Sequence, residues 1–364
     1  MISLTHLITP GLQKSTASFL NNLEKNKILV KVITKSSHLI ANKPTSTKNT
    51  AFPRQIPEWG SCQFVFGNEQ DYDWLVVYDD FVGKIELKCP PQNTLLVTLE
   101  PSSIKTYESA YIRQFGYVLT GQENWALKHP GKILSQPGLF WYYGTTRTYD
   151  QIAQEIPQEK TLDISTVTSS KCQSHTLHKK RNFFIEELQK KLPKLDRFGR
   201  GIREINDKAD ALDPYKYHLV IENHRCNHWF TEKLPDAFLG LTLPFYYGAP
   251  NADEYFPPES FIPIDINDPV KSSEIISHTI KNNEYEKRLP HIHKAREQVL
   301  KKYNFYATTS NIIEQKFLKE KSITAQNQLL VSRNELRKIP HKAFITLLEK
   351  IRNKSVGFVK NIRG

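Results

Sequence analysis

The sequence contains no run of about 18 consecutive apolar residues, so it offers no ordinary transmembrane helix. Its start lacks a charged segment followed by an apolar block, and we therefore expect no signal peptide. Only 4 of its 364 residues are cysteine and none forms a Cys-x-x-Cys pair, which favours free thiols in a reducing compartment. The lack of a signal peptide and of a membrane-spanning helix, with free thiols, leads us to expect a cytoplasmic protein.

Positive charge is in excess, with a net charge of +12 and a pI near 9.3. Much of it lies in residues 332–364, where nine Lys or Arg stand against two Glu among interspersed apolar residues. A basic amphipathic segment of this kind favours peripheral binding to an anionic membrane surface, here the inner face of the membrane. A solvated helix packed on its own domain explains the same pattern. No nucleic-acid-binding motif accompanies the charge, so we expect no nucleic acid partner.

The composition permits two domains of ordinary size, since 39% of the residues are hydrophobic. In the first part, short apolar runs alternate with loops or helical stretches, as in an α/β domain. We expect this domain to cover residues 1–155, with a charged linker at 154–160. Its expected strands are 4–12, 27–33, 74–78, 94–99 and 117–120.

The second domain is expected over residues 160–330 and opens with an apolar strand at 164–167. An amphipathic helix over 179–192 follows, and the basic tail begins at 332. The apolar residues that this helix should direct inward are Phe183, Phe184, Ile185 and Leu188.

The most informative stretch of this domain is residues 217–248, which reads as strand, polar loop, helix and strand. Thr231 is a good N-cap residue, so Glu232 and Lys233 should lie in the first helical turn, where free N–H groups favour an anion. Gly240 is a natural helix end. The polar residues follow a strand's carboxyl end, which is where open α/β sheets bind ligands.

Two patterns raise the question of a metal. His224, His228 and Glu232 stand at helical spacing with Cys226 close by, as zinc ligands do. We expect no metal site here, because a cap at Thr231 leaves both histidines outside the helix. The segment 71–73 is an Asp-x-Asp, but it precedes a strand and is therefore expected to be a structural loop.

The segment 217–248 resembles the donor-binding signature of glycosyltransferase family 10, the α-1,3/1,4-fucosyltransferases. The resemblance lies in Ile221-Glu222-Asn223, the loop aromatic Trp229, Thr231-Glu232-Lys233 and Gly248-Ala249-Pro250, and it continues in residues 256–262. Two departures stand out. The loop aromatic is usually Tyr in the family, and His218 occupies a position where Tyr is often found.

Shorter matches lie elsewhere. Residues 168–171 followed by Arg181 resemble the family's Ser-Asn loop and its later helical Arg, and residues 95–101 resemble the strand that carries its catalytic Glu. The rest of the N-terminal third shows little similarity, as expected of a domain that recognises a different acceptor. The resemblance implies an α/β fold of GT-B architecture, in which two Rossmann-like domains face each other across a cleft.

Roles for individual residues follow from the resemblance. Glu100 would be the catalytic base, and Arg181 and Lys233 would hold the donor diphosphate. Donor binding would also involve Ser169, Ser170, Asn223, Trp229 and Glu232. Each has a plainer interpretation: Glu100 as a solvated strand end, Arg181 as a surface charge in competition with Lys179 and Lys180, Lys233 as a helix-surface lysine, Asn223 as a turn residue, Glu232 as a helix-start stabiliser and Trp229 as a core aromatic.

The chemistry of sugar transfer fits these residue types. A carboxylate can accept the proton of the attacking hydroxyl, and Arg, Lys and a helix start can stabilise a departing diphosphate without a metal. The resemblance thus implies an inverting, metal-independent fucosyltransferase that needs no cofactor beyond its donor, GDP-fucose. It should act on a bacterial surface polysaccharide or lipid-linked oligosaccharide, as in lipopolysaccharide biosynthesis. Transfer from another nucleotide sugar, and nucleotide or carbohydrate binding without turnover, remain alternatives.

Overall fold

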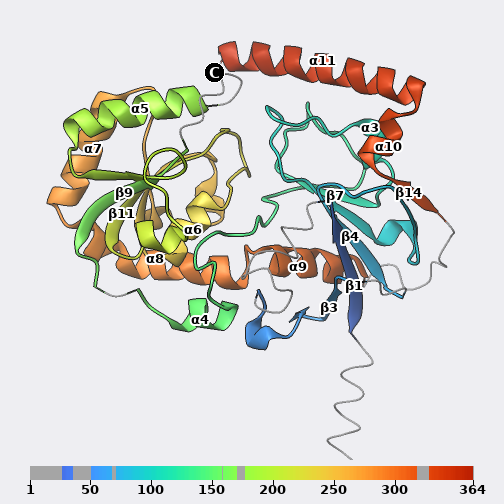
Figure 1. Cartoon of the computed structure of the whole chain (residues 1–364), viewed down its shortest axis with the longest axis horizontal. Coiled ribbons are helices and arrows are strands. Elements are labelled where there is room, and N and C mark those ends of the chain that lie inside the picture. Colours follow the sequence, from blue (N-terminus) through green and yellow to red (C-terminus); the bar gives the residue numbers. More distant parts are fainter. Residues whose placement is uncertain are drawn as a thin grey trace, which may run out of the picture.

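Two parallel β-sheets organise the protein, as a computed structural model shows (Figure 1). The structure describes residues 27–35, 51–67, 71–157, 159–169, 177–317 and 328–363. The predicted strand at 4–12 lies outside this part of the chain. None of the helices in the described part is both long and apolar enough to span a membrane.

The first sheet has the order β2-β3-β1-β4-β6-β7-β8, and all its pairings are parallel except that of β2 with β3. Its central strand β4 is fully apolar and buried because both faces of the sheet are covered. Strands β4 and β7 have the predicted bounds, whereas β6 is two residues shorter than expected. The strands are β1 (Ile28–Thr34), β2 (Glu58–Trp59), β3 (Cys62–Val65), β4 (Trp74–Tyr78), β6 (Thr94–Val97), β7 (Tyr117–Thr120) and β8 (Lys132–Leu134).

The second sheet is entirely parallel, with the order β10-β9-β11-β12-β13. Numbered along the chain this is the doubly wound order 2-1-3-4-5, whose direction reverses between β9 and β11. Ligands bind at such a reversal, outside the carboxyl ends of the strands. The strands are β9 (Leu162–Val167), β10 (Leu195–Phe198), β11 (Tyr215–Ile221), β12 (Leu243–Tyr247) and β13 (Ile262–Pro263).

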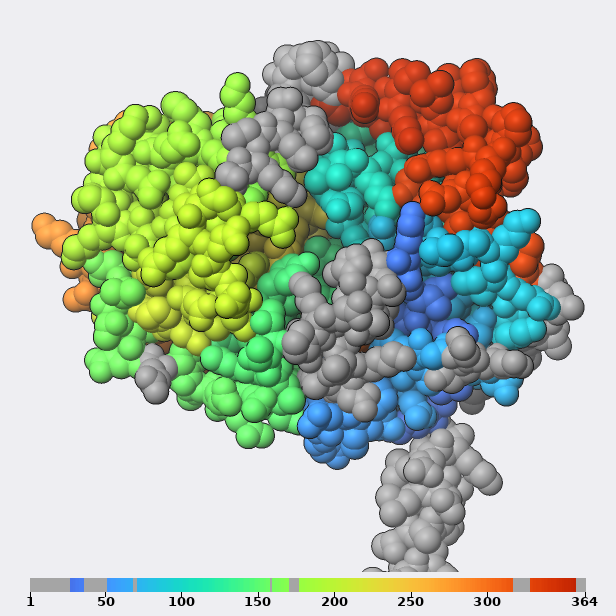
Figure 2. Space-filling view, viewed as in Figure 1, coloured from blue at the N-terminus to red at the C-terminus, as the bar shows by residue number. Residues whose placement is uncertain are grey.

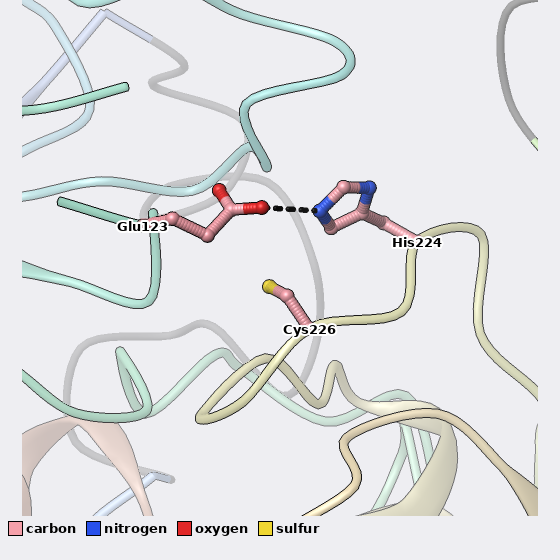
Figure 3. Close-up of side chains that lie close together, drawn as sticks. All are labelled: Glu123, His224 and Cys226. Atoms are coloured by element: carbon pink, nitrogen blue, oxygen red, sulfur yellow. Dashed lines mark ion pairs between the residues drawn. The ribbon is translucent and has the colours of Figure 1, made fainter. Parts of the chain in front are cut away.

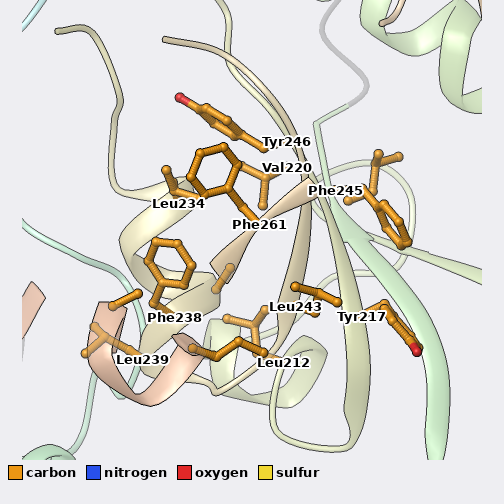
Figure 4. Packing of buried hydrophobic residues seen from close by; sticks show 14 of the residues in the cluster. Leu212, Tyr217, Val220, Leu234, Phe238, Leu239, Leu243, Phe245, Tyr246 and Phe261 are labelled. Atoms are coloured by element: carbon orange, nitrogen blue, oxygen red, sulfur yellow. The ribbon is translucent and has the colours of Figure 1, made fainter. Parts of the chain in front are cut away.

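Helices enclose the second sheet in a single apolar core (Figures 1 and 4). Leu234 and Phe238 of one helix pack with Val220 of β11 and Phe261 beside β13. Phe183 is an exception to the predicted inward face, because its side chain is 59% exposed while its three predicted companions are buried. The helices are α5 (His178–Lys191), α6 (Lys233–Leu239), α7 (Pro269–Lys281) and α8 (Glu284–Lys301).

The chain returns to the first sheet earlier than the sequence suggested. Helix α9 (Phe305–Phe317) places Phe305 against Tyr78 and Tyr306 against Phe52, in the core of the first domain. Strand β14 (Leu329–Val331) then pairs with β5 (Lys84–Glu86). The predicted boundary at residue 330 is therefore wrong, and the second domain ends near the start of α9. In the other direction, α4 (Tyr149–Gln154) packs into the second core, so the crossing begins before residue 155.

The basic tail is attached to the first domain by one of its faces. Arg333 of α10 (Arg333–Arg337) forms a buried ion pair with Glu108, which also binds Arg337. In α11 (Pro340–Arg363), Glu349 accepts a hydrogen bond from the Ser109 N–H and Asn353 donates one to the Ala126 carbonyl. The other face of α11 remains open. Its exposed apolar side chains are Phe344, Ile345, Leu347, Leu348 and Ile351.

Candidate functional site

The two domains meet with their strand ends facing each other. Glu100 follows β6 of the first sheet, while Asn223 follows β11 of the second. The charges of Lys233 and Glu232 both act on the Glu100 carboxyl group, which shows that these residues of the two domains lie near one another. Glu100, Glu232 and Lys233 therefore lie near the domain boundary, beside the reversal of the second sheet.

Arg181 and Asn223 form a direct contact at this reversal. The Arg181 Nη1 donates to Asn223 Oδ1 at 2.7 Å, and the Arg181 side chain is buried. Its neighbours Lys179 and Lys180 are exposed on the outer face of α5. Of the three cations, the fold therefore turns Arg181 toward the strand ends, and Asn223 is more than a turn residue because it orients this guanidinium.

Lys233 lies at the start of α6, held by residues before the helix. Its ammonium donates to Thr231 Oγ1 at 2.7 Å and lies 3.3 Å from Glu222 Oε2. Thr231 is not the N-cap as predicted, since its N–H and hydroxyl both donate to the Glu222 carboxylate at 2.7 and 2.8 Å, and Glu232 takes the cap position. Thr231 is drawn away from the cap position because the fully buried Glu222 carboxylate needs hydrogen bonds from Thr231 in addition to its ion pair with Lys233.

Lys208 completes the charge network, although no sequence pattern indicated this residue. Its ammonium contacts Asp236 Oδ2 at 2.5 Å and Glu232 Oε1 at 3.5 Å. Lys208 belongs to a short 3₁₀ turn in a polar segment without periodicity, so only the tertiary structure brings it here. Burial opposes ionisation of Glu232, but Lys233 and Lys208 outweigh it and lower the pKa of this carboxyl to about 2.

The surroundings of Glu100 raise the pKa of its carboxyl group. Burial, reinforced by the charge of Asp79, raises the pKa of the Glu100 carboxyl above its usual value, against the opposing influence of Lys105 and Lys233. Its main-chain carbonyl accepts a hydrogen bond from Gln122 at 2.8 Å, which fixes the loop after β6. A carboxyl with a raised pKa accepts a proton more readily near neutral pH, which suits a general base.

Trp229 is 2% exposed and packs between the domains. A Cβ atom on Gly121, which follows β7, would lie only 2.8 Å from Trp229 Cε3, so this contact requires glycine. The structure therefore supports the core interpretation of Trp229 over donor stacking. His218 is likewise buried, with Nδ1 2.7 Å from Ser165 Oγ. Ser169 is partly buried after β9, and Ser170 lies outside the described residues.

Two other sequence patterns are resolved by the fold. His228 contacts Tyr255 Oη at 2.6 Å and Glu232 turns to the lysines, so His224, His228 and Glu232 form no common site. Asp73 of the Asp-x-Asp accepts a hydrogen bond from the Leu29 N–H at 2.7 Å, as expected of a structural loop.

Comparison with known proteins converges on the same part of the chain. Residues 157–287 match the family model described as "Glycosyltransferase family 10 (fucosyltransferase) C-term". This part of the chain is therefore similar to the C-terminal domain of glycosyltransferase family 10. The matched part contains Arg181, Lys208, Asn223, Glu232 and Lys233, whereas Glu100 lies outside it.

Individual relatives of this chain are distant. A 135-residue stretch is 30% identical to "4-galactosyl-N-acetylglucosaminide 3-alpha-L-fucosyltransferase 9" of Mus musculus, covering 35% of this chain and 36% of that protein. A 58-residue stretch is 36% identical to "Alpha-(1,3)-fucosyltransferase FucT" of Helicobacter pylori, covering 16% and 12%. The chain thus matches about a third or less of these relatives' lengths. A solved α1,3-fucosyltransferase covers 78% of this chain and 93% of its own at 16% identity, but its TM-score of 0.46 adds nothing to the argument.

Proposed function

We propose that this protein transfers L-fucose from GDP-fucose to a hydroxyl group of a glycan acceptor, with inversion at the sugar carbon. The observation that carries the proposal is the position of the family 10 residues Arg181, Asn223 and Lys233 at the reversal of the second sheet, opposite Glu100 of the first domain. The acceptor class that we propose is a bacterial surface polysaccharide or lipid-linked oligosaccharide.

The reaction needs a base and an anion stabiliser. The acceptor oxygen attacks the anomeric carbon, its proton passes to the Glu100 carboxylate, and the bond from the anomeric carbon to the diphosphate oxygen breaks to release GDP. Arg181 and Lys233 stabilise the growing charge on that oxygen. Lys233 suits this role because, although burial opposes its charge, Glu222 and Glu232 raise the pKa of the ammonium and keep it protonated.

A panel of GDP- and UDP-sugars, scored by nucleotide release and by the mass of the glycan product, tests the proposal. We expect turnover with GDP-fucose and a product heavier by one deoxyhexose. Faster turnover with another nucleotide sugar would reassign the donor. Tight binding of GDP without turnover on any glycan acceptor would identify a binding protein instead.

Replacing Arg181 or Lys233 with alanine should weaken GDP binding. Loss of a hydrogen bond to a charged group costs about 1.5–3 kcal/mol, which is roughly 10- to 150-fold in Kd. Isothermal titration calorimetry with GDP measures this effect directly. Lys180→Ala is the matched control, because Lys180 is a neighbouring but exposed cation on α5. Unchanged GDP affinity in folded Arg181→Ala protein would contradict the assignment.

We also propose that α11 binds an anionic membrane surface, which would bring a lipid-linked acceptor to the site. The helical period places Phe344, Leu347, Leu348 and Ile351 on one face, and all four are at least 50% exposed. That face is opposite the one that carries Asn353 and contacts the first domain. Lysine and arginine residues along the same helix supply attraction to anionic lipid.

Replacing Phe344 and Leu348 together with glutamine should reduce binding to vesicles that contain anionic lipid, because it removes apolar area from the open face. Vesicle co-sedimentation at physiological salt measures the bound fraction. Val82→Gln with Val270→Gln is the control, since it removes two exposed apolar side chains elsewhere. Equal loss in both double variants, or equal binding of wild type to neutral vesicles, would contradict the proposal.

A further inference from the structure

Three side chains with metal-binding atoms meet at the boundary of the two domains (Figure 3). Glu123 comes from the loop after β7 of the first domain, and His224 and Cys226 come from the loop after β11 of the second. Their ligand atoms all lie within 4.8 Å of one another. The chemistry of the proposed sugar transfer uses none of the three.

The His224 imidazole is oriented toward this cluster. Its Nε2 atom is buried and lacks a hydrogen-bond partner among the described residues, and it lies 3.6 Å from Glu123 Oε1. That separation is too long for a hydrogen bond, and a buried nitrogen without one is costly. In a tetrahedral zinc site, with bonds of about 2.0–2.3 Å, adjacent ligand atoms lie roughly 3.3–3.6 Å apart. The existing separation already matches this spacing.

Outer contacts orient two of these ligands. The second oxygen of Glu123 accepts a hydrogen bond from Ser102 Oγ at 2.7 Å. The Cys226 sulfur lies 3.7 Å from the Gly121 carbonyl, toward which its thiol points. Lys132 lies close enough to act electrostatically on both Glu123 and Cys226, but its ammonium donates to the carbonyls of Gln122 and Leu127 and to the Asn124 side chain. A hydrogen bond such as the one from Ser102 to Glu123 is common for carboxylate ligands at metal sites, where it holds the carboxylate in position.

We propose that Glu123, His224 and Cys226 bind a Zn²⁺ ion that clamps the two domains together. One imidazole nitrogen, one thiolate and one carboxylate form a donor set that zinc accepts, with water as the fourth ligand. Binding releases the thiol proton to solvent and forms the zinc–sulfur bond. The sequence pattern contained two of the three proposed ligands, His224 and Cys226, but combined them with His228 and Glu232. Glu123 was missed because it is about a hundred positions away in the chain.

The proposed zinc ion lies between the two loops that carry Glu100 and Asn223. Ser102, which binds Glu123, is two residues from Glu100, and Gln122 beside Glu123 binds the Glu100 carbonyl. His224 directly follows Asn223. A zinc ion here therefore joins the loop of the base to the loop of the donor-binding residues, and fixes their separation without touching the substrates.

Cobalt provides a spectroscopic test that does not depend on transferase activity. Titration of metal-free full-length protein with Co²⁺ should give about one ion per chain, with near-ultraviolet thiolate-to-cobalt absorption and visible bands of a tetrahedral site that Zn²⁺ abolishes. Cys226→Ser should lose the thiolate absorption. Glu123→Gln and His224→Ala should weaken binding by more than the roughly 10- to 100-fold typical of an outer-shell change. Cys62→Ala, in the core of the first domain, should leave all of this unchanged.

The clamp itself has a separate readout. Zn²⁺ should slow amide hydrogen exchange in the loops at 100–103 and 222–228 together, in wild type but not in folded Glu123→Gln protein. A thiolate band that survives Cys226→Ser, or Zn²⁺ affinity equal in wild type and in the Glu123→Gln and His224→Ala variants, would overturn the site. Zinc binding that protects only the 222–228 loop would overturn the bridge between domains.

Discussion

Glu100→Gln should lower the rate of sugar transfer by about 10²- to 10⁴-fold, the usual contribution of a positioned general base. Glutamine has nearly the same shape but cannot take up the proton of the acceptor hydroxyl. The affinity for GDP should remain unchanged, because Glu100 lies in the first domain while the residues assigned to the diphosphate lie in the second. Single-turnover rates and calorimetric Kd values measured on the same preparations separate these two effects.

The pH profile supplies an independent check on this base. Since Glu100 must be deprotonated to act, kcat/KM should fall as the pH drops through its pKa, which burial and Asp79 raise above the usual value for Glu. Glu86→Gln, which removes an exposed carboxylate of the same domain, should preserve both the rate and the profile. Normal transfer by Glu100→Gln would show that another group accepts the proton.

Glu108→Ala should destabilise the first domain by about 3–5 kcal/mol, because it leaves the buried Arg333 guanidinium without its partner. The same carboxylate binds Arg337, so the substitution also loosens α10 and the start of α11 from the domain. Urea unfolding followed by tryptophan fluorescence reports the change, provided that the transition of the first domain is resolved from that of the second.

Two comparison variants make this expectation specific. Glu335→Ala removes only an exposed pair with Lys338, which contributes about 1 kcal/mol or less. Glu108→Leu combined with Arg333→Met replaces the buried pair by apolar side chains and should recover much of the lost stability. If Glu108→Ala and Glu335→Ala unfold at the same urea concentration, the buried pair does not hold the C-terminal segment.

The sequence predicted elements well where apolar periodicity alone decides them. The short apolar runs Trp74–Tyr78 and Tyr117–Thr120 predict strands inside a parallel sheet, because such a sheet covers the side chains on both faces. Thr231 was misassigned because the helix start is set by Glu222, nine positions earlier. The boundary at 330 was wrong because the pattern of α9 shows that one face is buried, but not which of two cores receives it.

The candidate site likewise contains residues that the local sequence predicts and residues that only the tertiary structure brings together. Asn223, Glu232 and Lys233 could be located from the local order of strand, loop and helix. The role of Arg181 was proposed only through the family resemblance, and its pairing with Asn223, 42 positions away, is shown only by the structure. Lys208 and Glu123 could not be predicted, because each reaches its partners through the packing of separate elements and has no distinctive neighbours in the sequence.

The return of α9, β14 and α10 to the first domain has a consequence for synthesis on the ribosome. The second domain is continuous from β9 to α8 and can complete its core as soon as those residues have emerged. The first domain, although its strands are made earlier, must wait for Phe305, Tyr306, Leu330 and Leu336 to fill its core. Its nascent sheet therefore stays incompletely covered while more than 150 further residues are translated, and such exposed apolar surface favours misassembly.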